Sequence, residues 1–155
     1  MDSLSATFTE QFDVVLSAGD GLPHLKTQAG VKQALIEMSK RVRPGGCLLI
    51  GLNDYEQIKR EKPRFYFTRI CEDKTARKLF VFLADYIDND TMVANIIHLK
   101  EVNGIWKQSA HIATPKYMLD RPQVETLLQE VGYQEIICKQ HRWGRVFMVH
   151  KEDTI

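Results

Sequence analysis

The chain has 155 residues, of which 44% are hydrophobic and 26% are charged, and its formal net charge at pH 7 is +1. A composition of this kind suits one globular domain with a hydrophobic core. Because charges of both signs are spread along the chain, nothing in it favours nucleic acid or an anionic membrane as a partner.

The three cysteines are far apart and form no CxxC pair, so neither a disulfide framework nor a metal site is expected. Cys47 and Cys138 lie in apolar strand patterns, which favours buried free thiols. The N-terminal residues lack the charged start and apolar run of a signal peptide, and no stretch suits a membrane span. By default, we expect a cytoplasmic protein.

The first predicted strand is Phe12–Leu16, which ends in a run of consecutive apolar residues without polar alternation. Such a run is typical of a strand that is buried on both faces of a parallel sheet. Gly19 and Gly21 then end the strand and allow a tight loop.

A helix is predicted to begin after Thr27, whose hydroxyl suits an N-cap. Its apolar residues recur at helical spacing and form one stripe: Val31, Ala34, Leu35, Met38 and Val42. The turn Arg43–Gly46 (RPGG) ends the helix, because proline cannot continue it and glycine permits a reversal. Cys47–Leu52 is a second apolar strand, so the unit predicts a right-handed parallel crossover.

The pattern changes beyond Tyr55, where Gln57–Pro63 is charged and is expected to be exposed. Three or four β-patterned runs then follow without helices between them: Arg64–Cys71, Lys78–Ile87, Met92–Val102 and Ile105–His111. Asp88–Asp90 and Asn103-Gly104 have the composition of turns. We therefore expect an antiparallel β-meander inserted over residues 64–114.

A second helix is predicted at Asp120, which forms a capping-box pattern with Gln123. Its apolar stripe consists of Val124, Leu127, Leu128 and Val131. Gln134–Lys139 and Arg145–His150 are close enough to pair as a closing hairpin. The chain has no repeat and no clear linker, so residues 1–155 are expected to form a single domain.

Polar residues follow both predicted parallel strands at their carboxyl ends. Ser17–His24 is glycine-rich and carries Asp20 and His24, and Asn53–Tyr55 follows the second strand. Ligands of open α/β sheets bind at this edge, so the two loops predict a small-molecule site. Two ordinary loops with solvated polar residues would give the same pattern, and both interpretations stay open.

The run FDVVLSAGDGLPHL, the RPGG turn and the run CLLIGLNDYEQI resemble the second half of a class I S-adenosylmethionine-dependent methyltransferase. Among these enzymes, they are most similar to the glycine/sarcosine N-methyltransferase-like group. The resemblance covers nearly the whole chain from Phe12 onward. It implies an α/β fold, namely a partial doubly wound, Rossmann-like sheet with an inserted antiparallel β-meander and a closing antiparallel hairpin. It also implies S-adenosylmethionine as the cofactor.

The resemblance implies that the backbone of Ser17, Ala18 and Gly19 lies against the methionine part of the cofactor. Glycine suits such a close approach because it has no side chain. His24 matches a loop histidine of the family that orients cofactor or substrate. A loop histidine that only caps backbone groups would fit the sequence equally well.

The resemblance also places Asn53 and Tyr55 at a small-molecule substrate. Tyr55 matches a tyrosine of the family, and Asp20 stands where the family often has asparagine. Asn53 stands where glycine-methylating members carry an arginine that grips a carboxylate. Asparagine cannot make this bidentate charged contact, so we do not expect an amino-acid carboxylate as the substrate handle.

Methyl transfer to a nitrogen or oxygen acceptor needs donor and acceptor held in line, together with a base for the departing proton. His24, Asp20 and Tyr55 are the candidates for this base. The meander is expected to wall the acceptor side. Its aromatic residues are expected to fill the core rather than to form a cation cage: Phe65, Phe67, Phe80, Phe82 and Trp106.

The glycine-rich loop and the ribose-binding acid of the family's first half are not found before Phe12. We therefore expect half of the cofactor pocket to be missing and Phe12–Leu16 to be a sheet edge. Edge strands are normally blunted, whereas this one carries a single charge, so it is expected to pair with a second copy or a complementing chain. If no other polypeptide completes the cofactor pocket, the chain would be a non-catalytic dimerisation or partner-binding module, or a truncated product without function.

Overall fold

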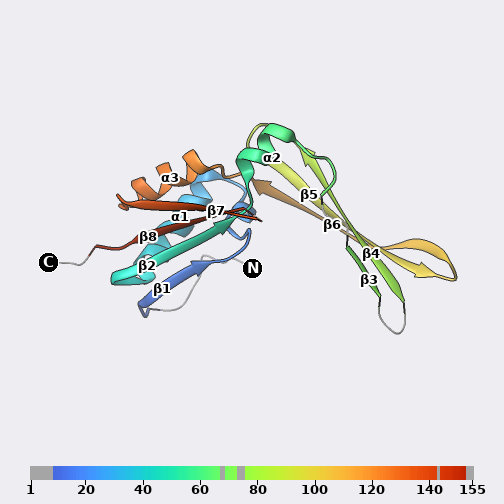
Figure 1. Ribbon diagram of the computed structural model, residues 1–155, viewed down its shortest axis with the longest axis horizontal. Coiled ribbons are helices and arrows are strands. Elements are labelled where there is room, and N and C mark those ends of the chain that lie inside the picture. The colour runs from blue at the N-terminus through green and yellow to red at the C-terminus, as the bar shows by residue number, and fades with distance from the viewer. Residues whose placement is uncertain (1–8, 67–68, 73–75, 143, 153–155) are drawn as a thin grey trace.

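The computed structural model describes residues 9–66, 69–72, 76–142 and 144–152, which form two four-stranded sheets (Figure 1). The strand order of the first sheet is β1 (Phe12–Ser17), β2 (Val42–Leu52), β8 (Gly144–His150), β7 (Ile136–His141). β1 and β2 are parallel, and the other pairs are antiparallel. The predicted parallel pair and the closing hairpin are therefore confirmed.

Two helices, α1 (Gln28–Arg41) and α3 (Arg121–Glu130), cover one face of the first sheet (Figure 1). α1 begins as predicted, since the Thr27 hydroxyl accepts a hydrogen bond from the Gly30 N–H at 3.1 Å. α3 begins with the predicted capping box between Asp120 and Gln123. These local signals mark the residues at which both helices begin.

The main core lies between these helices and the first sheet. Its innermost side chains come from α1, β2, α3 and β8: Leu35, Leu48, Ile50, Leu127, Leu128, Phe147 and Val149. The apolar stripes read from the sequence therefore point into this core. Burial of each large apolar side chain contributes about 1.5 to 3 kcal/mol to folding.

β2 is longer than predicted, because it begins at Val42 and includes the RPGG turn. Gly45 has a φ of +70°, which only glycine adopts readily, and its N–H donates to the Lys151 carbonyl at 3.0 Å. The Lys151 N–H in turn donates to the Gly46 carbonyl at 2.9 Å. The C-terminal segment thus extends the pairing of β2 beyond the region that the apolar pattern marks.

β1 is an edge of its sheet, as predicted, but only one of its faces is covered within the described residues. Val15 packs on the main core. Phe12, Val14 and Leu16 point to the opposite face and are 44%, 53% and 60% exposed. The expectation of a strand buried on both faces is therefore not met by this chain alone.

The second sheet is the predicted antiparallel meander and extends away from the first sheet (Figure 1). Its strands in order are β3 (Arg69–Glu72), β4 (Arg77–Tyr86), β5 (Thr91–Val102) and β6 (Ile105–Tyr117). Its inner face carries Ala84 and Met92, which are buried against α2 and Tyr55. That the meander belongs to one domain with the first sheet remains a prediction.

The helix α2 (Tyr55–Glu61) connects the two sheets and was not predicted, because its charged residues favoured an exposed segment. The Asp54 side chain caps it by accepting from the Gln57 N–H at 3.1 Å. Lys59 holds α2 in place, since its ammonium donates to Asp90 at 2.6 Å and to Asp120 at 2.8 Å. No helix in the described part of the chain is long and apolar enough to cross a membrane.

The prediction that the aromatic residues of the meander fill the core is wrong for Phe65 and Trp106, which are 73% and 36% exposed. Phe80 and Phe82 are half-buried, and Phe67 lies outside the described residues. The reason is that the second sheet has no covering layer on its outer side within the described residues.

Candidate functional site

The loops after β1 and β2 lie side by side, as the sequence predicts for neighbouring parallel strands. Ser17 at the end of β1 is in register with Ile50 of β2. A Cβ atom on Gly51 would lie 3.5 Å from the Gly19 nitrogen, so the two backbones are in close contact. Gly19 has a φ of +68° and open space where its side chain would be. A ligand can therefore approach the Gly19 backbone closely.

Asp20 is the centre of a hydrogen-bonded cluster between the two sheets. Its Oδ2 atom accepts from the Tyr55 hydroxyl at 2.5 Å and from the Lys116 ammonium at 2.6 Å. Its Oδ1 atom accepts from the Asn53 N–H at 3.4 Å. The structure thus brings together three residues predicted at the site and adds a lysine.

Sequence analysis missed Lys116, which lies near the end of β6 and is only 14% exposed. It is 96 positions from Asp20, and its neighbours in the sequence form an unremarkable strand. No local pattern marks such a residue, because only the packing of the second sheet brings it to Asp20. The ammonium of Lys116 stabilises the negative charge of the Asp20 carboxylate, from which water is partly excluded.

His24 lies in the short 3₁₀ helix η1 (Leu22–Leu25), which packs near β6. Partial desolvation lowers the pKa of His24 below its ordinary value of 6.5, and the nearby charge of Lys116 lowers it further, whereas Asp20 opposes the shift. The imidazole is therefore neutral at pH 7, and a neutral imidazole can accept a proton.

Tyr55 is 1% exposed, and burial followed by the adjacent Asp20 charge strongly raises the pKa of its phenol. The hydroxyl therefore keeps its proton and donates it in the hydrogen bond to Asp20. Burial also raises the pKa of Tyr66, whose hydroxyl lies 3.0 Å from the hydroxyl of Tyr86. Neither phenol is poised to remove a proton.

Two adjoining pockets open at the end of the first sheet. One has a volume of about 210 Å³ and is lined by residues from the β1 loop, β2 and the closing hairpin: Gly19, Gly51, Leu52, Asn53, His141, Gly144, Arg145 and Val146. The other has a volume of about 240 Å³ and includes Gln57, Tyr66 and Gln140. Asn53 and Gly144 line both pockets, so the two are neighbours, and together they are called the hollow here.

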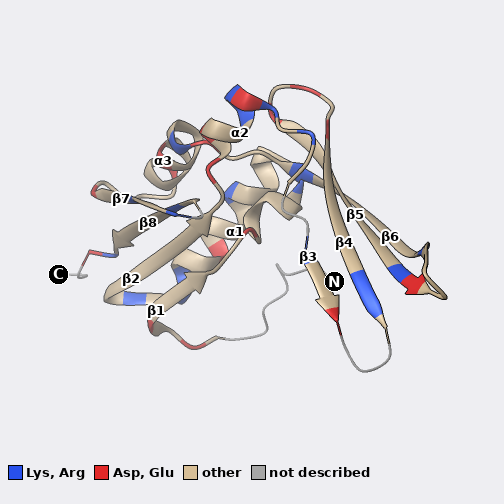
Figure 2. Cartoon of the chain, turned by 45° about the vertical axis from the view of Figure 1, so that its right-hand side comes forward, with Lys and Arg blue, Asp and Glu red and all other residues tan. Residues whose placement is uncertain are grey.

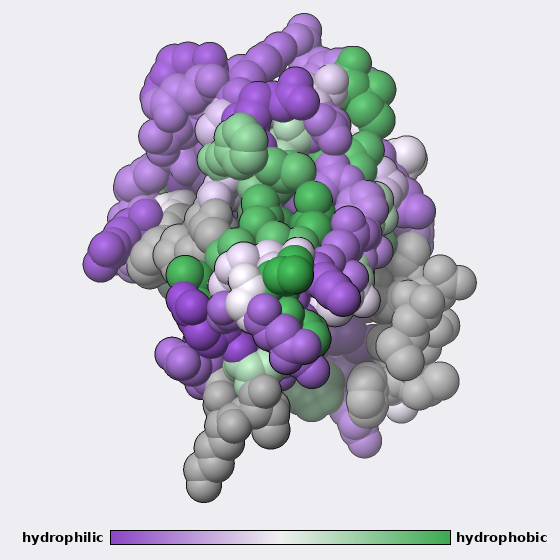
Figure 3. All heavy atoms as spheres, turned by 90° about the vertical axis from the view of Figure 1, so that its right-hand side faces the viewer, coloured by the Kyte–Doolittle hydropathy of each residue, from purple (hydrophilic) through white to green (hydrophobic). Residues whose placement is uncertain are grey.

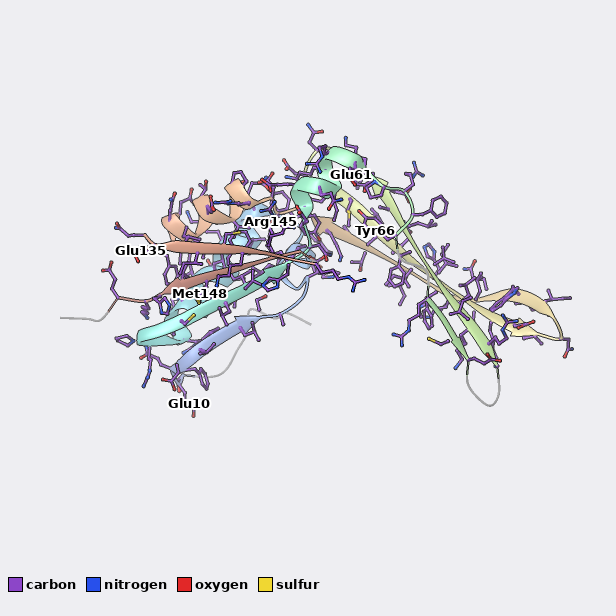
Figure 4. All side chains as sticks on the ribbon, in the orientation of Figure 1. Glu10, Glu61, Tyr66, Glu135, Arg145 and Met148 are labelled. Carbon is purple, nitrogen blue, oxygen red and sulfur yellow. The ribbon has the colours of Figure 1, made fainter. Side chains whose placement is uncertain are left out.

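The closing hairpin approaches the end of β2 at Gly144. A Cβ atom there would lie 1.9 Å from the Leu52 carbonyl oxygen, so only glycine fits. The next residue, Arg145, forms ion pairs with Asp54 and Glu56 at the start of α2. Arg145 lies at the end of the first sheet that points toward Tyr66 and the second sheet (Figure 4).

The predicted site residues thus fall into two groups. Gly19 and Asn53 line the hollow, with Ser17 and Ala18 next to Gly19 in the chain. Asp20, Tyr55 and Lys116 form the cluster beside it, and the His24 pKa responds to the charges of this cluster. Arg145, Gln140 and Tyr66 are additional residues of the hollow that the sequence analysis did not single out.

No protein-family sequence model matches this chain, and no curated protein matches it in sequence. Three-dimensional comparison, by contrast, finds similar solved structures, several of which are methyltransferases. DesVI from Streptomyces venezuelae has a TM-score of 0.78 at 11% identity over 97% of this chain. The sugar N-methyltransferase KedS8 from Streptoalloteichus has a TM-score of 0.75 at 14% identity over 99% of this chain.

A third similar structure is CalS10 from Micromonospora echinaspora, an amino pentose methyltransferase solved with S-adenosylmethionine bound, at a TM-score of 0.75 and 14% identity over 97% of this chain. The chain spans 61% to 63% of the length of these three proteins. It therefore has the α/β fold of S-adenosylmethionine-dependent methyltransferases over about three fifths of their length.

Proposed function

We propose that this chain takes part in S-adenosylmethionine-dependent methyl transfer to a small-molecule acceptor. The observation that carries the proposal is the hollow at the carboxyl ends of β1 and β2, in a fold shared with methyltransferases. Its backbone is open at Gly19, and a neutral histidine and a bound carboxylate lie beside it. Active sites of open α/β sheets form at this edge.

The residues present fit one part of the cofactor. The open space above Gly19 suits the methionine part, held by the backbone of Ser17, Ala18 and Gly19 with His24 beside it. The adjoining pocket of about 210 Å³ is smaller than the roughly 300 to 1,000 Å³ of pockets that hold a whole small ligand. The rest of the cofactor therefore needs further protein surface.

The bound cofactor would supply a sulfonium methyl group for transfer to the acceptor lone pair, with the electrons of the broken carbon–sulfur bond going to sulfur. The acceptor then loses a proton, for which His24 is the best placed of the three candidate bases. Asp20 already accepts hydrogen bonds from three donors, and Tyr55 keeps its proton, so these two residues position the loop and the acceptor.

The acceptor is proposed to be an amine or hydroxyl without a carboxylate handle, which Asn53 and Tyr55 would help to bind. Two of the similar structures are named as a sugar N-methyltransferase and an amino pentose methyltransferase, which favours nitrogen. Likeness to the glycine/sarcosine group and a cytoplasmic location remain predictions.

We also propose that β1 pairs with a second copy or with a complementing polypeptide. Its exposed side chains Phe12, Val14 and Leu16 continue the uncovered face of the first sheet, and a partner there would add surface beside Gly19. The matched methyltransferases are longer than this chain, which is consistent with such an addition.

Calorimetric titration with S-adenosylhomocysteine tests the function. We expect saturable binding with a dissociation constant of about 1 to 10 μM, or roughly −7 to −8 kcal/mol. Gly19→Val should weaken it at least tenfold by filling the space that the cofactor needs. Gly104→Val is the matched control, because Gly104 also has a positive φ and open space but lies in the β5–β6 turn.

A folded wild-type chain that shows no binding at millimolar ligand would overturn the proposal. The exposed edge of β1 would then favour the second candidate function, a non-catalytic module that binds a partner through this strand. Equal weakening by the two glycine variants would instead show that binding does not use the loop after β1.

A further inference from the structure

Tyr66 lies where the second sheet meets the hollow. Its N–H donates to the Phe82 carbonyl at 3.0 Å, so the segment before β3 pairs with the edge of β4. The preceding residue, Phe65, forms a bridge with Leu83 and is 73% exposed on the outer face of the sheet. Side chains alternate along a strand, so Tyr66 points to the inner face. There it packs on the cluster around Tyr55 and lines the pocket of about 240 Å³.

The sheet beside Tyr66 is mostly apolar. Figure 3 shows a stripe of hydrophobic residues on the side of the molecule that carries the second sheet, with hydrophilic residues on either side. Figure 2 shows charged residues at the far end of β4, β5 and β6 and few along their middle. Tyr66 and Tyr86 bring two partly buried hydroxyl groups into this sheet. Because such groups need hydrogen-bond partners, the partners decide where each hydroxyl hydrogen points.

The direction of the hydrogen bond between Tyr66 and Tyr86 follows from a third group. The Tyr86 hydroxyl lies 2.9 Å from the Pro63 carbonyl oxygen, which can only accept, so Tyr86 donates its single hydrogen there. The two hydroxyl oxygens lie 3.0 Å apart, and the Tyr66 hydroxyl must therefore donate to Tyr86. The Tyr66 oxygen is left with lone pairs, so it can accept a hydrogen bond from a ligand but cannot donate one.

Tyr66 lies beside the groups to which the reaction is assigned above. Asn53 lines both the pocket that includes Gly19 and the pocket that includes Tyr66. Burial raises the pKa of the Tyr66 phenol, and a smaller cause is the charge of Asp20, which also acts on the pKa of His24. An acceptor in the Tyr66 pocket would therefore adjoin a cofactor placed at Gly19.

The number of hydrogens on the nucleophile decides which acceptor fits the Tyr66 oxygen. A primary amine has two N–H groups and a lone pair. One N–H can face the base, proposed as His24, and the other can donate to Tyr66, while the lone pair forms the bond to the methyl carbon. A hydroxyl has a single hydrogen, which must go to the base because Tyr66 already holds a proton. The hydroxyl oxygen would then set its lone pairs against those of Tyr66.

We propose that Tyr66 is a specificity-determining residue, which accepts a hydrogen bond from the acceptor nitrogen and so selects a primary amine over a hydroxyl. Tyr86 and Pro63 are positioning residues, because they hold the Tyr66 hydrogen away from the ligand. This role rests on the proposed function and narrows its acceptor to one chemical class.

NMR of the chain labelled with [ζ-¹³C]tyrosine tests this role in the presence of S-adenosylhomocysteine. The chain has five tyrosines, and the signal absent from Tyr66→Phe is that of Tyr66. The probes are cyclohexylamine and cyclohexanol, which share one ring and differ in the N–H or O–H group. The amine should shift the Tyr66 signal saturably, and the alcohol should not. Followed at the Asn53 and Gln140 side-chain amides, amine binding should weaken about fivefold in Tyr66→Phe, as the loss of one hydrogen bond predicts.

Tyr86→Phe separates the direction of the hydrogen bond from simple attraction between charges. This variant frees the Tyr66 hydrogen to donate, so cyclohexanol should bind it about fivefold more tightly than it binds the wild type. Tyr133→Phe is the matched control. The Tyr133 hydroxyl bonds Ser39 near His150, at the other end of β8, so its loss should leave the binding of both probes unchanged.

An amine that leaves the Tyr66 signal unmoved up to about 50 mM overturns this role. So does equal amine binding by the wild type and Tyr66→Phe, or a cyclohexanol affinity that Tyr86→Phe leaves unchanged. Titration with S-adenosylhomocysteine alone reports separately on the proposed function. Its saturable binding with an unmoved Tyr66 signal would remove only the role of Tyr66. Its failure to bind, with the amine still shifting Tyr66, would overturn the proposed function and support an amine site at Tyr66.

Discussion

Asp20 is the residue through which the two sheets meet, because it accepts from Tyr55 next to the first sheet and from Lys116 in the second. Its carboxylate is 16% exposed and the Lys116 side chain is 14% exposed. In a mostly buried ion pair, each charge is stabilised mainly by its partner, because little water reaches it. The position of the loop after β1 therefore depends on a residue of β6.

Replacing Lys116 tests this dependence. Lys116→Met should reduce the free energy of unfolding by about 3 kcal/mol, because it leaves the Asp20 charge without its cationic partner. Lys107→Met, at an exposed position of the same strand, should change it by less than about 0.5 kcal/mol. Urea denaturation measures these free energies. The double variant Asp20→Asn/Lys116→Met should lose less free energy of unfolding than the sum of the losses in the two single variants. Strict additivity would show that the two residues are not coupled.

The protonation of His24 reports on the same cluster. Its midpoint in a ¹H NMR titration should lie below 6.5 and should rise in Lys116→Met, since this variant removes a charge that lowers the pKa. The folded pKa is depressed, so the stability contributed by neutral His24 is present above pH 6.5 and is lost as the pH falls through the folded pKa. The imidazole signal of His24 is identified as the one that disappears from the spectrum of the His24→Gln variant. An unmoved midpoint in Lys116→Met would contradict the electrostatic coupling.

At the scale of elements, the start of β8 is the contact that shapes the hollow. Gly144 has a φ of +151° and leaves no room for a side chain beside Leu52. Gly144→Ala should therefore destabilise the chain by about 3 kcal/mol or more, because the hairpin must move away from β2. Gly104→Ala, with a φ of +75° and open space, should cost only about 1 kcal/mol. Equal losses in melting temperature would mean that backbone strain alone matters at Gly144.

The helices show where local sequence is sufficient. α1 and α3 begin at the predicted caps, because a side chain three positions away in sequence satisfies the first free N–H groups. α2 has the same kind of cap at Asp54, but its charged residues hide an apolar side formed by Tyr55 and Ile58. That side becomes visible only when Met92 and Ala84 of the second sheet pack against it.

At the scale of the whole molecule, the chain leaves apolar surface open at two places. One is the face of the first sheet that includes Val14 and Leu16, and the other is the outer face of the second sheet. A sheet needs a layer on each apolar face. Within the described residues, α1 and α3 cover one face of the first sheet, and α2 covers part of one face of the second. Pairing at β1, as proposed above, would add protein surface beside Gly19.

The sequence alone determined the parallel pair, the helix caps, the meander and the loops after β1 and β2, because each depends on residues a few positions apart. Only the tertiary structure decided that Lys116 joins Asp20, that Arg145 joins Asp54 and that Phe65 and Trp106 are exposed. The first depends on the placement of the second sheet against the first, and the second on the placement of β8 beside β2. Contacts between distant segments arise from packing, which leaves no periodic trace in the sequence.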